Sequence, residues 1–316
     1  MKAKETGDIQ QTDDYLVRVI YGDTDSCYID YNQLLNTIEG WDKMSFNEKL
    51  NILIHLHTDY INKNNREVME EYFKGRNCRD MIHEFELETI AKSGVWLNVK
   101  KRYAQILAWK DGKYYDEDEL PMKIKGLEVV KSSYPAIARD MLKSLVRSLL
   151  EAESTDEMEV LTSLNTQMQQ ARMKWEEAPL ESICPSISVN NYTKYIISDN
   201  KPEGPEVALK CPFAVRGLAT YNNIRQVHGL PGEPIYGGKL RYYVIKPDSI
   251  KKRKTEQVFC FRASEYPDWA PRYAPIDRKA MFIKCVLDPF NRILEGIGFR
   301  RLQWDGFLGM TQLSLF

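Results

Sequence analysis

The alternation of apolar and polar residues predicts a β-hairpin near the start of the chain. Residues 16–21 are rich in β-branched and aromatic side chains, and this pattern resumes over residues 27–29. Residues 22–26 between them are Gly, Asp, Thr, Asp and Ser, which favour a tight reversal because their side chains are short or absent. The hairpin would hold Asp23 and Asp25 close together at its tip. A polar turn is the simplest interpretation of these residues alone, but a divalent cation would relieve the repulsion between two rigidly held carboxylates.

Helical spacing of apolar residues predicts a long helix over residues 45–74. Ser45 and Glu48 form an S-x-x-E capping box at its start, and Gly75 follows as a C-cap. The pattern leaves open whether this is one helix or two helices that break near residues 64–65.

Period-two alternation then predicts antiparallel strands. The first covers residues 80–91, with Glu86 and Glu88 on its polar face, and such a pair of glutamates is most often only a solvated face. A turn at residues 92–94 would lead into a strand over residues 95–109, on which alternate residues share a face. A further turn at residues 111–112 completes this meander.

The second half of the sequence is dominated by helical patterns. Pro135 suits a first helical turn, and a second capping box, Ser154 and Glu157, predicts a helix that ends before Pro179. A short strand is expected over residues 241–245, and a helix interrupted by a proline over residues 281–294. The fold class predicted from these patterns is therefore α+β.

Composition narrows the class of protein. A chain of 316 residues is long enough for two domains, and no apolar run approaches the ~18 residues of a membrane span. The six cysteines form no C-x-x-C pair, which favours reduced thiols in a cytosol. The net charge of -1 argues weakly against nucleic-acid binding, but residues 92–131 contain nine Lys or Arg and only six Asp or Glu.

The hexad Y-G-D-T-D-S at residues 21–26 resembles the third polymerase motif of the B-family DNA polymerases. The resemblance implies a hairpin in the palm of a polymerase, in which Asp25 binds both catalytic metal ions and Asp23 has a smaller role. The strand H-E-F-E-L-E-T-I-A resembles the strand beside that hairpin, so Glu88 would be an additional active-site carboxylate.

Two further motifs follow in the order that this family shows. The run K-K-R-Y resembles the motif that holds the primer end in the minor groove, and Lys101 and Tyr103 would face the primer together. The run K-I-K-G-L-E resembles the K-x-x-G-x-E segment that leads into a helical thumb and holds duplex phosphates. The residues expected to bind DNA are Lys100, Lys101, Arg102, Tyr103, Lys125, Gly126 and Lys131.

Within the family, the sequence is most similar to the replicative polymerases of T-even-type bacteriophages, as K-S-S-x-P at residues 131–135 and K-C-P-F at residues 210–213 indicate. The resemblance implies a partial palm of antiparallel sheet plus helices, followed by a mainly helical thumb. The expected domains are a polar extension (1–14), the C-terminal part of the palm (15–131), the thumb (132–308) and a tail (309–316).

Several parts of such a polymerase find no counterpart in the sequence. There is no second metal aspartate motif, no fingers helix and no exonuclease domain, and only 22 residues precede Asp23. We therefore expect the C-terminal subunit of a split DNA polymerase, inactive until it assembles with an N-terminal polymerase chain. The expected cofactor is Mg²⁺, as two ions shared with that chain, and the substrates are primer-template DNA and deoxynucleoside triphosphates. The alternative is a non-catalytic subunit that holds DNA and tethers a sliding clamp.

The end of the chain resembles a clamp-binding peptide. It reads Q-L-S-L-F, and its apolar residues would have no core left to bury them. The residues expected to bind a sliding clamp are Gln312, Leu313, Leu315 and Phe316. A tail that packs on its own domain is the alternative, and the expected location is the cytoplasm of a bacterial host cell.

Overall fold

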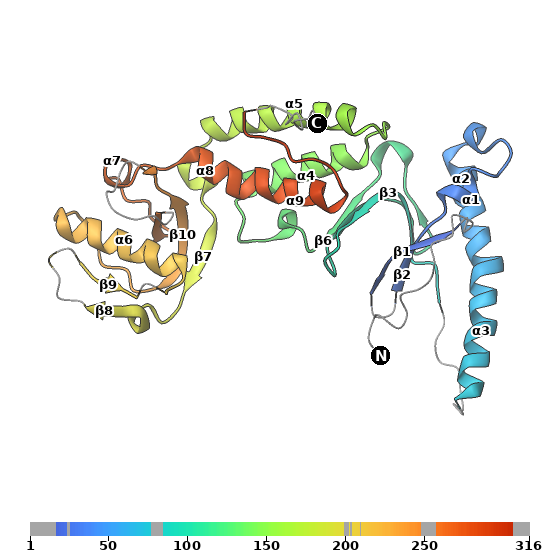
Figure 1. Cartoon of the computed structure of the whole chain (residues 1–316), viewed down its shortest axis with the longest axis horizontal. Coiled ribbons are helices and arrows are strands. Elements are labelled where there is room, and N and C mark those ends of the chain that lie inside the picture. Colours follow the sequence, from blue (N-terminus) through green and yellow to red (C-terminus); the bar gives the residue numbers. More distant parts are fainter. Residues whose placement is uncertain are drawn as a thin grey trace, which may run out of the picture. The chain divides into compact units, whose positions relative to one another are not determined.

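The computed structural model describes residues 17–23, 26–76, 85–198, 202, 204–208, 210–247 and 257–305. The chain divides into two compact units, Met1–Lys123 and Ile124–Phe316, which are labelled by element in Figure 1. Helices and small antiparallel sheets occur in both, so the predicted α+β class is confirmed. None of the helices in the described part is both long and apolar enough to cross a membrane.

The predicted hairpin is present in the first unit. Strand β1 (Arg18–Asp23) pairs antiparallel with β2 (Ser26–Asp30), and Asp23 lies opposite Ser26 at the last pair before the tip. The tip residues Thr24 and Asp25 lie outside the described residues.

The predicted long helix is confirmed, with a different irregularity. After the short α1 (Asn32–Leu35), one helical run passes from an α-helix through a π-helical stretch into a second α-helix. Its parts are α2 (Phe46–His55), η3 (Leu56–Ile61) and α3 (Asn62–Gly75).

The ends of this run test the predicted caps. The Ser45 hydroxyl accepts from the Glu48 amide at 3.4 Å, and the Glu48 carboxylate accepts from the Ser45 amide at 2.8 Å, so the capping box is confirmed. The chain does not break at residues 64–65. Gly75 is the last residue of α3 rather than its cap, because the C-cap is Arg76, which has φ −105°.

The sheet of the first unit starts later than predicted. Its strands are β3 (Thr89–Trp96), β4 (Tyr103–Lys110), β5 (Lys113–Tyr114) and β6 (Met122–Lys125), with β4 pairing to the other three. The division between the two units falls inside β6. Of the predicted strand over residues 80–91, residues 80–84 lie outside the described part and residues 85–88 are not in a strand.

The predicted turn at residues 92–94 is wrong, because β3 runs straight through it. Gly94 pairs with Gln105 in the β3–β4 ladder, and the Trp96 ring occupies the space that a side chain at Gly94 would fill. The glycine therefore makes room for an indole ring, and the chain reverses at residues 97–102 instead.

The second unit joins a helical part to a small sheet. The helices are α4 (Ala136–Leu150), α5 (Glu157–Glu177), α6 (Phe213–Val227), α7 (Ala270–Tyr273), α8 (Arg278–Phe282) and α9 (Asp288–Gly296), with a π-helical stretch η9 (Ile283–Leu287) between the last two. Helix α5 ends before Pro179 as predicted, but its N-cap is Asp156 rather than Ser154. The Asp156 carboxylate accepts from the Glu159 amide at 2.9 Å.

The sheet of the second unit has the order β7–β10–β11, from strands β7 (Ser186–Val189), β10 (Gly238–Val244) and β11 (Val258–Arg262). A separate small pair is β8 (Ile196–Ser198) with β9 (Glu206–Val207). Gly217 of α6 packs directly on Cys260 of β11, where a side chain would collide with the sulfur. The predicted strand over residues 241–245 overlaps β10, whereas β7 and β11 were not predicted.

Candidate functional site

Two of the sequence motifs meet in the first unit, although 80 residues separate them. The Lys101 amide donates a hydrogen bond to the Tyr21 hydroxyl at 2.6 Å. The Lys101 ammonium lies 3.7 Å from the Asp23 carboxylate. The K-K-R-Y run is therefore fastened to the hairpin that ends in the two aspartates.

The geometry of this run differs from the prediction. Lys100 and Lys101 lie in the turn between β3 and β4, not on a strand. The Leu97 amide closes the turn by donating to the Arg102 carbonyl oxygen at 3.0 Å, and Lys101 takes a left-handed φ of 61°, which is uncommon for a residue other than glycine. Because the chain reverses here, strand alternation no longer decides which way Lys101 and Tyr103 point.

Tyr103 supports the turn from within the unit. Its side chain is only 5% exposed, and its ring lies 6.2 Å from the ring of Tyr21 and 5.5 Å from that of Tyr28. Burial, together with the neighbouring Tyr103, raises the pKa of Tyr28 above its ordinary value. The Lys101 side chain is 59% exposed and Lys100 is exposed as well, whereas Arg102 is half-buried and Tyr103 is packed inside.

Of the expected active-site carboxylates, the structure describes Asp23 and Glu88. Asp23 lies at the end of β1 with its side chain 21% exposed, and Asp25 lies outside the described residues. The Glu88 side chain is 63% exposed and pairs with Lys123 at 3.4 Å. No group of three His, Cys, Asp or Glu side chains within the described ranges could hold a metal ion. Asp23 could therefore hold a divalent cation only together with ligands from outside the described residues.

The segment K-I-K-G-L-E is built around a buried carboxylate in the second unit. Gly126 has φ 69°, in the left-handed region that favours glycine. Two residues later, the Glu128 side chain is only 6% exposed and contacts Lys131 at 3.1 Å and Arg292 at 3.5 Å. Lys131 therefore forms an ion pair with Glu128 within its own unit. Sequence analysis did not find Arg292, because no local pattern links residues 164 positions apart.

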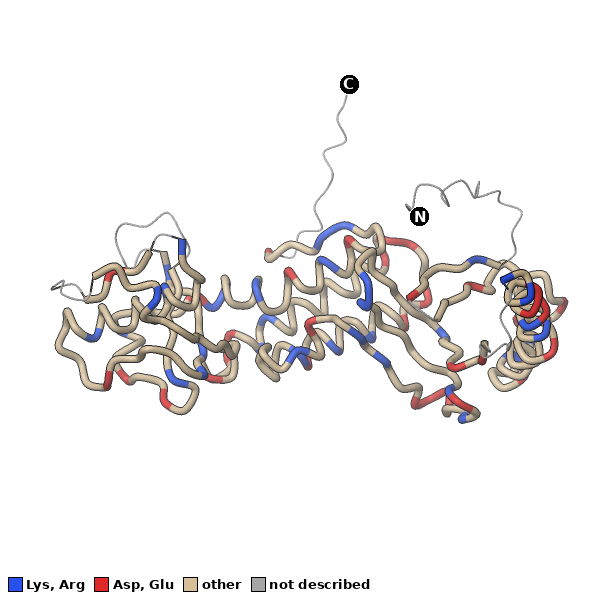
Figure 2. Tube along the Cα trace, turned by 90° about the horizontal axis from the view of Figure 1, so that it is seen from below, with Lys and Arg blue, Asp and Glu red and all other residues tan. Residues whose placement is uncertain are grey.

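Figure 2 shows Lys and Arg positions recurring along the helices of the second unit, interspersed with acidic ones. The net charge of -1 therefore does not describe the local distribution. The expected clamp-binding residues Gln312, Leu313, Leu315 and Phe316 lie outside the described residues. The last described segment is anchored, because the Trp304 ring lies 4.9 Å from the Arg172 guanidinium and 5.3 Å from the Lys279 ammonium.

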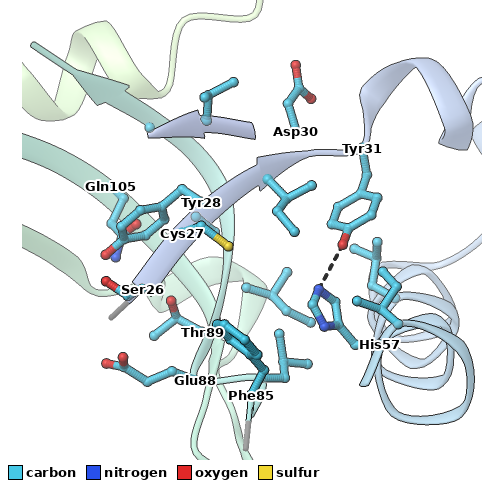
Figure 3. Close-up of a pocket in the computed structure, with 18 of the residues that line it drawn as sticks. Ser26, Cys27, Tyr28, Asp30, Tyr31, His57, Phe85, Glu88, Thr89 and Gln105 are labelled. Carbon is cyan, nitrogen blue, oxygen red and sulfur yellow. Dashed lines mark hydrogen bonds between the residues drawn. The ribbon is translucent and has the colours of Figure 1, made fainter. Parts of the chain in front are cut away.

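A cavity of about 440 Å³ lies in the first unit, between β2, the segment 85–94 and the helical run below them. Figure 3 shows its lining, including the hydrogen bond of 2.8 Å between the Tyr31 hydroxyl and His57 Nε2. Burial raises the pKa of Tyr31 to about 12 and lowers that of His57. Nothing in the sequence pattern indicated this cavity, because its walls come from segments far apart in the chain.

Two phage proteins are similar in sequence to most of this chain. Models of known protein families give no match. The DNA-directed DNA polymerase of Escherichia phage RB69 is 30% identical over 244 residues, which is 71% of this chain and 24% of that protein. The DNA-directed DNA polymerase of Enterobacteria phage T4 is 27% identical over 233 residues, or 69% of this chain and 23% of that protein.

The chain is similar to the DNA polymerases of T-even-type phages. The resemblance seen in its motifs is thus confirmed over more than two thirds of its length. The chain spans about a quarter of the length of these curated relatives, so the similarity concerns one part of a polymerase.

Proposed function

We propose that this chain supplies the C-terminal part of the palm and the thumb of a B-family DNA polymerase, with domain limits of 15–131 and 132–308. A second polypeptide would supply the exonuclease, the fingers and the remaining palm. The supporting observation is the contact of the Lys101 turn with Tyr21 and Asp23, because it joins two polymerase motifs at one place. The similarity to two phage polymerases supports the same proposal.

In this proposal Asp25 and Asp23 hold two Mg²⁺ ions together with a carboxylate from the second polypeptide, and Glu88 lies nearby. Bound there, the ions supply activation of the primer 3′ hydroxyl and neutralise charge on the triphosphate. The Lys101 ammonium lies 3.7 Å from the Asp23 carboxylate and offsets its charge in the free chain.

DNA binding would come from both units. Lys100, Lys101 and Arg102 present positive charge on the turn, and Tyr103 fixes that turn from inside. A cation there can contact a phosphate or the acceptors that all base pairs share in the minor groove, so it detects a pair without reading sequence. In the second unit the duplex would lie along Lys125, Gly126 and Lys131.

A second candidate is a non-catalytic subunit that holds DNA and tethers a clamp. Asp23, Asp25 and Lys101 are all present in the sequence, which argues against it. The proposed enzyme differs because its missing ligand arrives with the second polypeptide. In both cases the work would be done in the cytoplasm of an infected bacterium, with residues 312–316 bound to a sliding clamp.

Primer extension separates these candidates. The purified chain, the complementary polypeptide, and the two together would each be given primer-template, Mg²⁺ and four nucleotides. We expect synthesis only from the mixture. Synthesis by this chain alone would refute the split arrangement. A bound mixture that stays inactive would leave the non-catalytic subunit.

A further inference from the structure

A buried carboxylate in the second unit contacts two cations through one oxygen atom. The Glu128 side chain is 6% exposed, and its Oε1 lies 3.1 Å from the Lys131 ammonium and 3.5 Å from the Arg292 guanidinium. Both cations reach the solvent, since each side chain is 46% exposed. A buried charge is costly unless it is paired, so Glu128 needs positive charge beside it.

The local backbone fixes how Lys131 meets this carboxylate. Glu128 begins the short 3₁₀ turn η5 (Glu128–Val130), and the Lys131 amide closes that turn by donating to the Glu128 carbonyl oxygen at 3.1 Å. Residues three apart lie on the same side of a 3₁₀ turn, so the turn sets Lys131 beside Glu128. Leu127 and Val129 are buried on either side of Glu128, which keeps the carboxylate inside the unit.

Arg292 reaches the same oxygen from helix α9, whose packing fixes its position. The preceding residue, Asn291, is 2% exposed, and its side-chain amide is hydrogen-bonded to both backbone groups of Leu302. Arg292 also interacts with the Tyr134 side chain. A guanidinium is a planar and preorganised group, whereas a lysine ammonium ends a flexible four-carbon stem. Of the two cations, Lys131 is therefore the one that can leave Glu128.

We propose that Arg292 is a positioning residue for DNA binding, because it neutralises the buried Glu128 when the Lys131 ammonium moves from that carboxylate to a DNA phosphate. This inference rests on the proposed function, in which the duplex lies along Lys131. A phosphate and a carboxylate compete for the same ammonium, so Lys131 is available to DNA only if Glu128 keeps another counter-ion. Without the Arg292 charge, Lys131 stays on Glu128 and the duplex loses one phosphate contact.

Binding of a fluorescent primer-template duplex to the full chain, measured by anisotropy over a salt series, tests this. Arg292→Gln should weaken binding about three- to tenfold, and the slope of log affinity against log salt should fall by up to ~0.9, as for one lost phosphate contact. Arg292→Lys should keep most of the affinity, because it keeps the charge. Thermal unfolding followed by circular dichroism checks that each variant is folded.

The decisive step repeats Arg292→Gln in the Glu128→Gln background, where no buried charge needs a counter-ion. The weakening should then shrink to less than about twofold, because Arg292 acts through Glu128. An equal weakening in both backgrounds would show that Arg292 contacts DNA itself, and it would overturn the inference.

Arg301→Gln is the matched control. Arg301 pairs at 2.9 Å with Asp288 of α9, and this carboxylate is 41% exposed, so water can solvate it. The variant removes the same charge beside the same helix, and its effect on DNA affinity should be the same with and without Glu128→Gln. If that effect depends on Glu128 as strongly as the effect of Arg292→Gln does, the dependence reflects the overall charge of the unit and the inference fails.

Two further variants separate this inference from the proposed function. If Lys131→Ala leaves DNA affinity unchanged, the DNA contact of the proposed function and this inference both fail. If Lys131→Ala weakens binding while a folded Arg292→Gln variant does not, only the inference fails. Glu128→Gln alone decides the matter if Arg292→Gln does not fold. It releases Lys131, so affinity should rise at least about threefold, and an affinity that does not rise would overturn the inference.

Discussion

The two units differ in how their buried side-chain amides are hydrogen-bonded. In the second unit, the buried Asn222 side chain donates to the Ile235 carbonyl oxygen at 2.8 Å and accepts from its amide at 2.9 Å. Asn291 does the same with Leu302, at 3.0 Å and 2.9 Å. In the first unit, the equally buried Gln105 amide makes no hydrogen bond of this quality and has only a weak contact with the Tyr28 side chain. The buried asparagines of the second unit thus bind the backbone of a distant segment, whereas the buried glutamine of the first unit does not.

Apolar burial shows the same contrast. The second unit encloses large side chains completely, such as Trp175 and Phe259. Helix α3 of the first unit has no fully buried residue and leaves Val68 64% exposed and Tyr72 51% exposed. The comparison teaches that the second unit encloses the larger apolar core, while the helical run beside the proposed chemistry of the first unit leaves large apolar side chains exposed.

The largest expected effect is on the chemistry of the first unit. In the assembled enzyme, Asp25→Asn should lower the rate of primer extension roughly 100- to 1000-fold, because metal-ion charge stabilisation contributes several kcal/mol. DNA binding should be nearly unchanged. Asp23→Asn should cost less, since Lys101 already balances Asp23. Single-turnover extension measures both, and a reversed ranking would show that the roles within the tip are assigned wrongly.

The next prediction tests the contrast between the interiors directly. Asn222→Ala leaves the Ile235 amide and carbonyl buried and unpaired, so it should lower the free energy of unfolding by about 2–4 kcal/mol. Gln105→Leu in the chain alone should change it by less than about 1 kcal/mol, because only a weak contact with Tyr28 is lost. Denaturant unfolding followed by circular dichroism measures both changes. A large loss of unfolding free energy from Gln105→Leu would show that the Gln105 amide is well hydrogen-bonded inside the first unit.

The sequence predicted what local patterns decide. The hairpin, the Ser45 capping box and the end of α5 before Pro179 follow from turn chemistry, capping and proline geometry. It mispredicted the turn at residues 92–94, because Gly94 is required by the ring of Trp96 and not by a reversal. The distinction depends on how the Trp96 side chain folds back over its own strand, which the pattern of residue types does not show.

In the candidate site, too, local motifs predicted some residues, and contacts between distant segments were missed. The motifs named Lys101 and Asp23, and the structure places them 3.7 Å apart. The burial of Tyr103 and the pairing of Arg292 with Glu128 were not predicted, because they depend on contacts between distant segments. The functions of Asp25 and of residues 312–316 stay predictions.

A smaller effect is expected at the end of the second unit. Deleting residues 312–316 should leave the unit folded, because Trp304 is already held between Arg172 and Lys279. Short, distributive synthesis by the assembled enzyme should be unchanged. Stimulation by a loaded clamp should fall about tenfold or more, because a tethered peptide makes rebinding intramolecular. Product length on a long template, with and without clamp, measures this, and full stimulation of the truncated enzyme would refute a clamp-binding tail.

The smallest expected effect compares one cation of the first unit with one of the second. Lys101→Ala removes an exposed ammonium, and Lys131→Ala removes one that also pairs with the buried Glu128. If Lys101 contacts a phosphate, the slope of log affinity against log salt should fall by up to ~0.9, with little loss of folding stability. If it contacts the minor groove, extension from the terminal base pair should worsen while the slope stays constant.

Lys131→Ala should lower folding stability as well, because it removes one of the two cations beside a buried carboxylate. Fluorescence anisotropy over a salt series, with thermal unfolding of each variant, separates these outcomes. If Lys101→Ala changes neither binding nor extension, the turn is an exposed reversal and does not hold the primer.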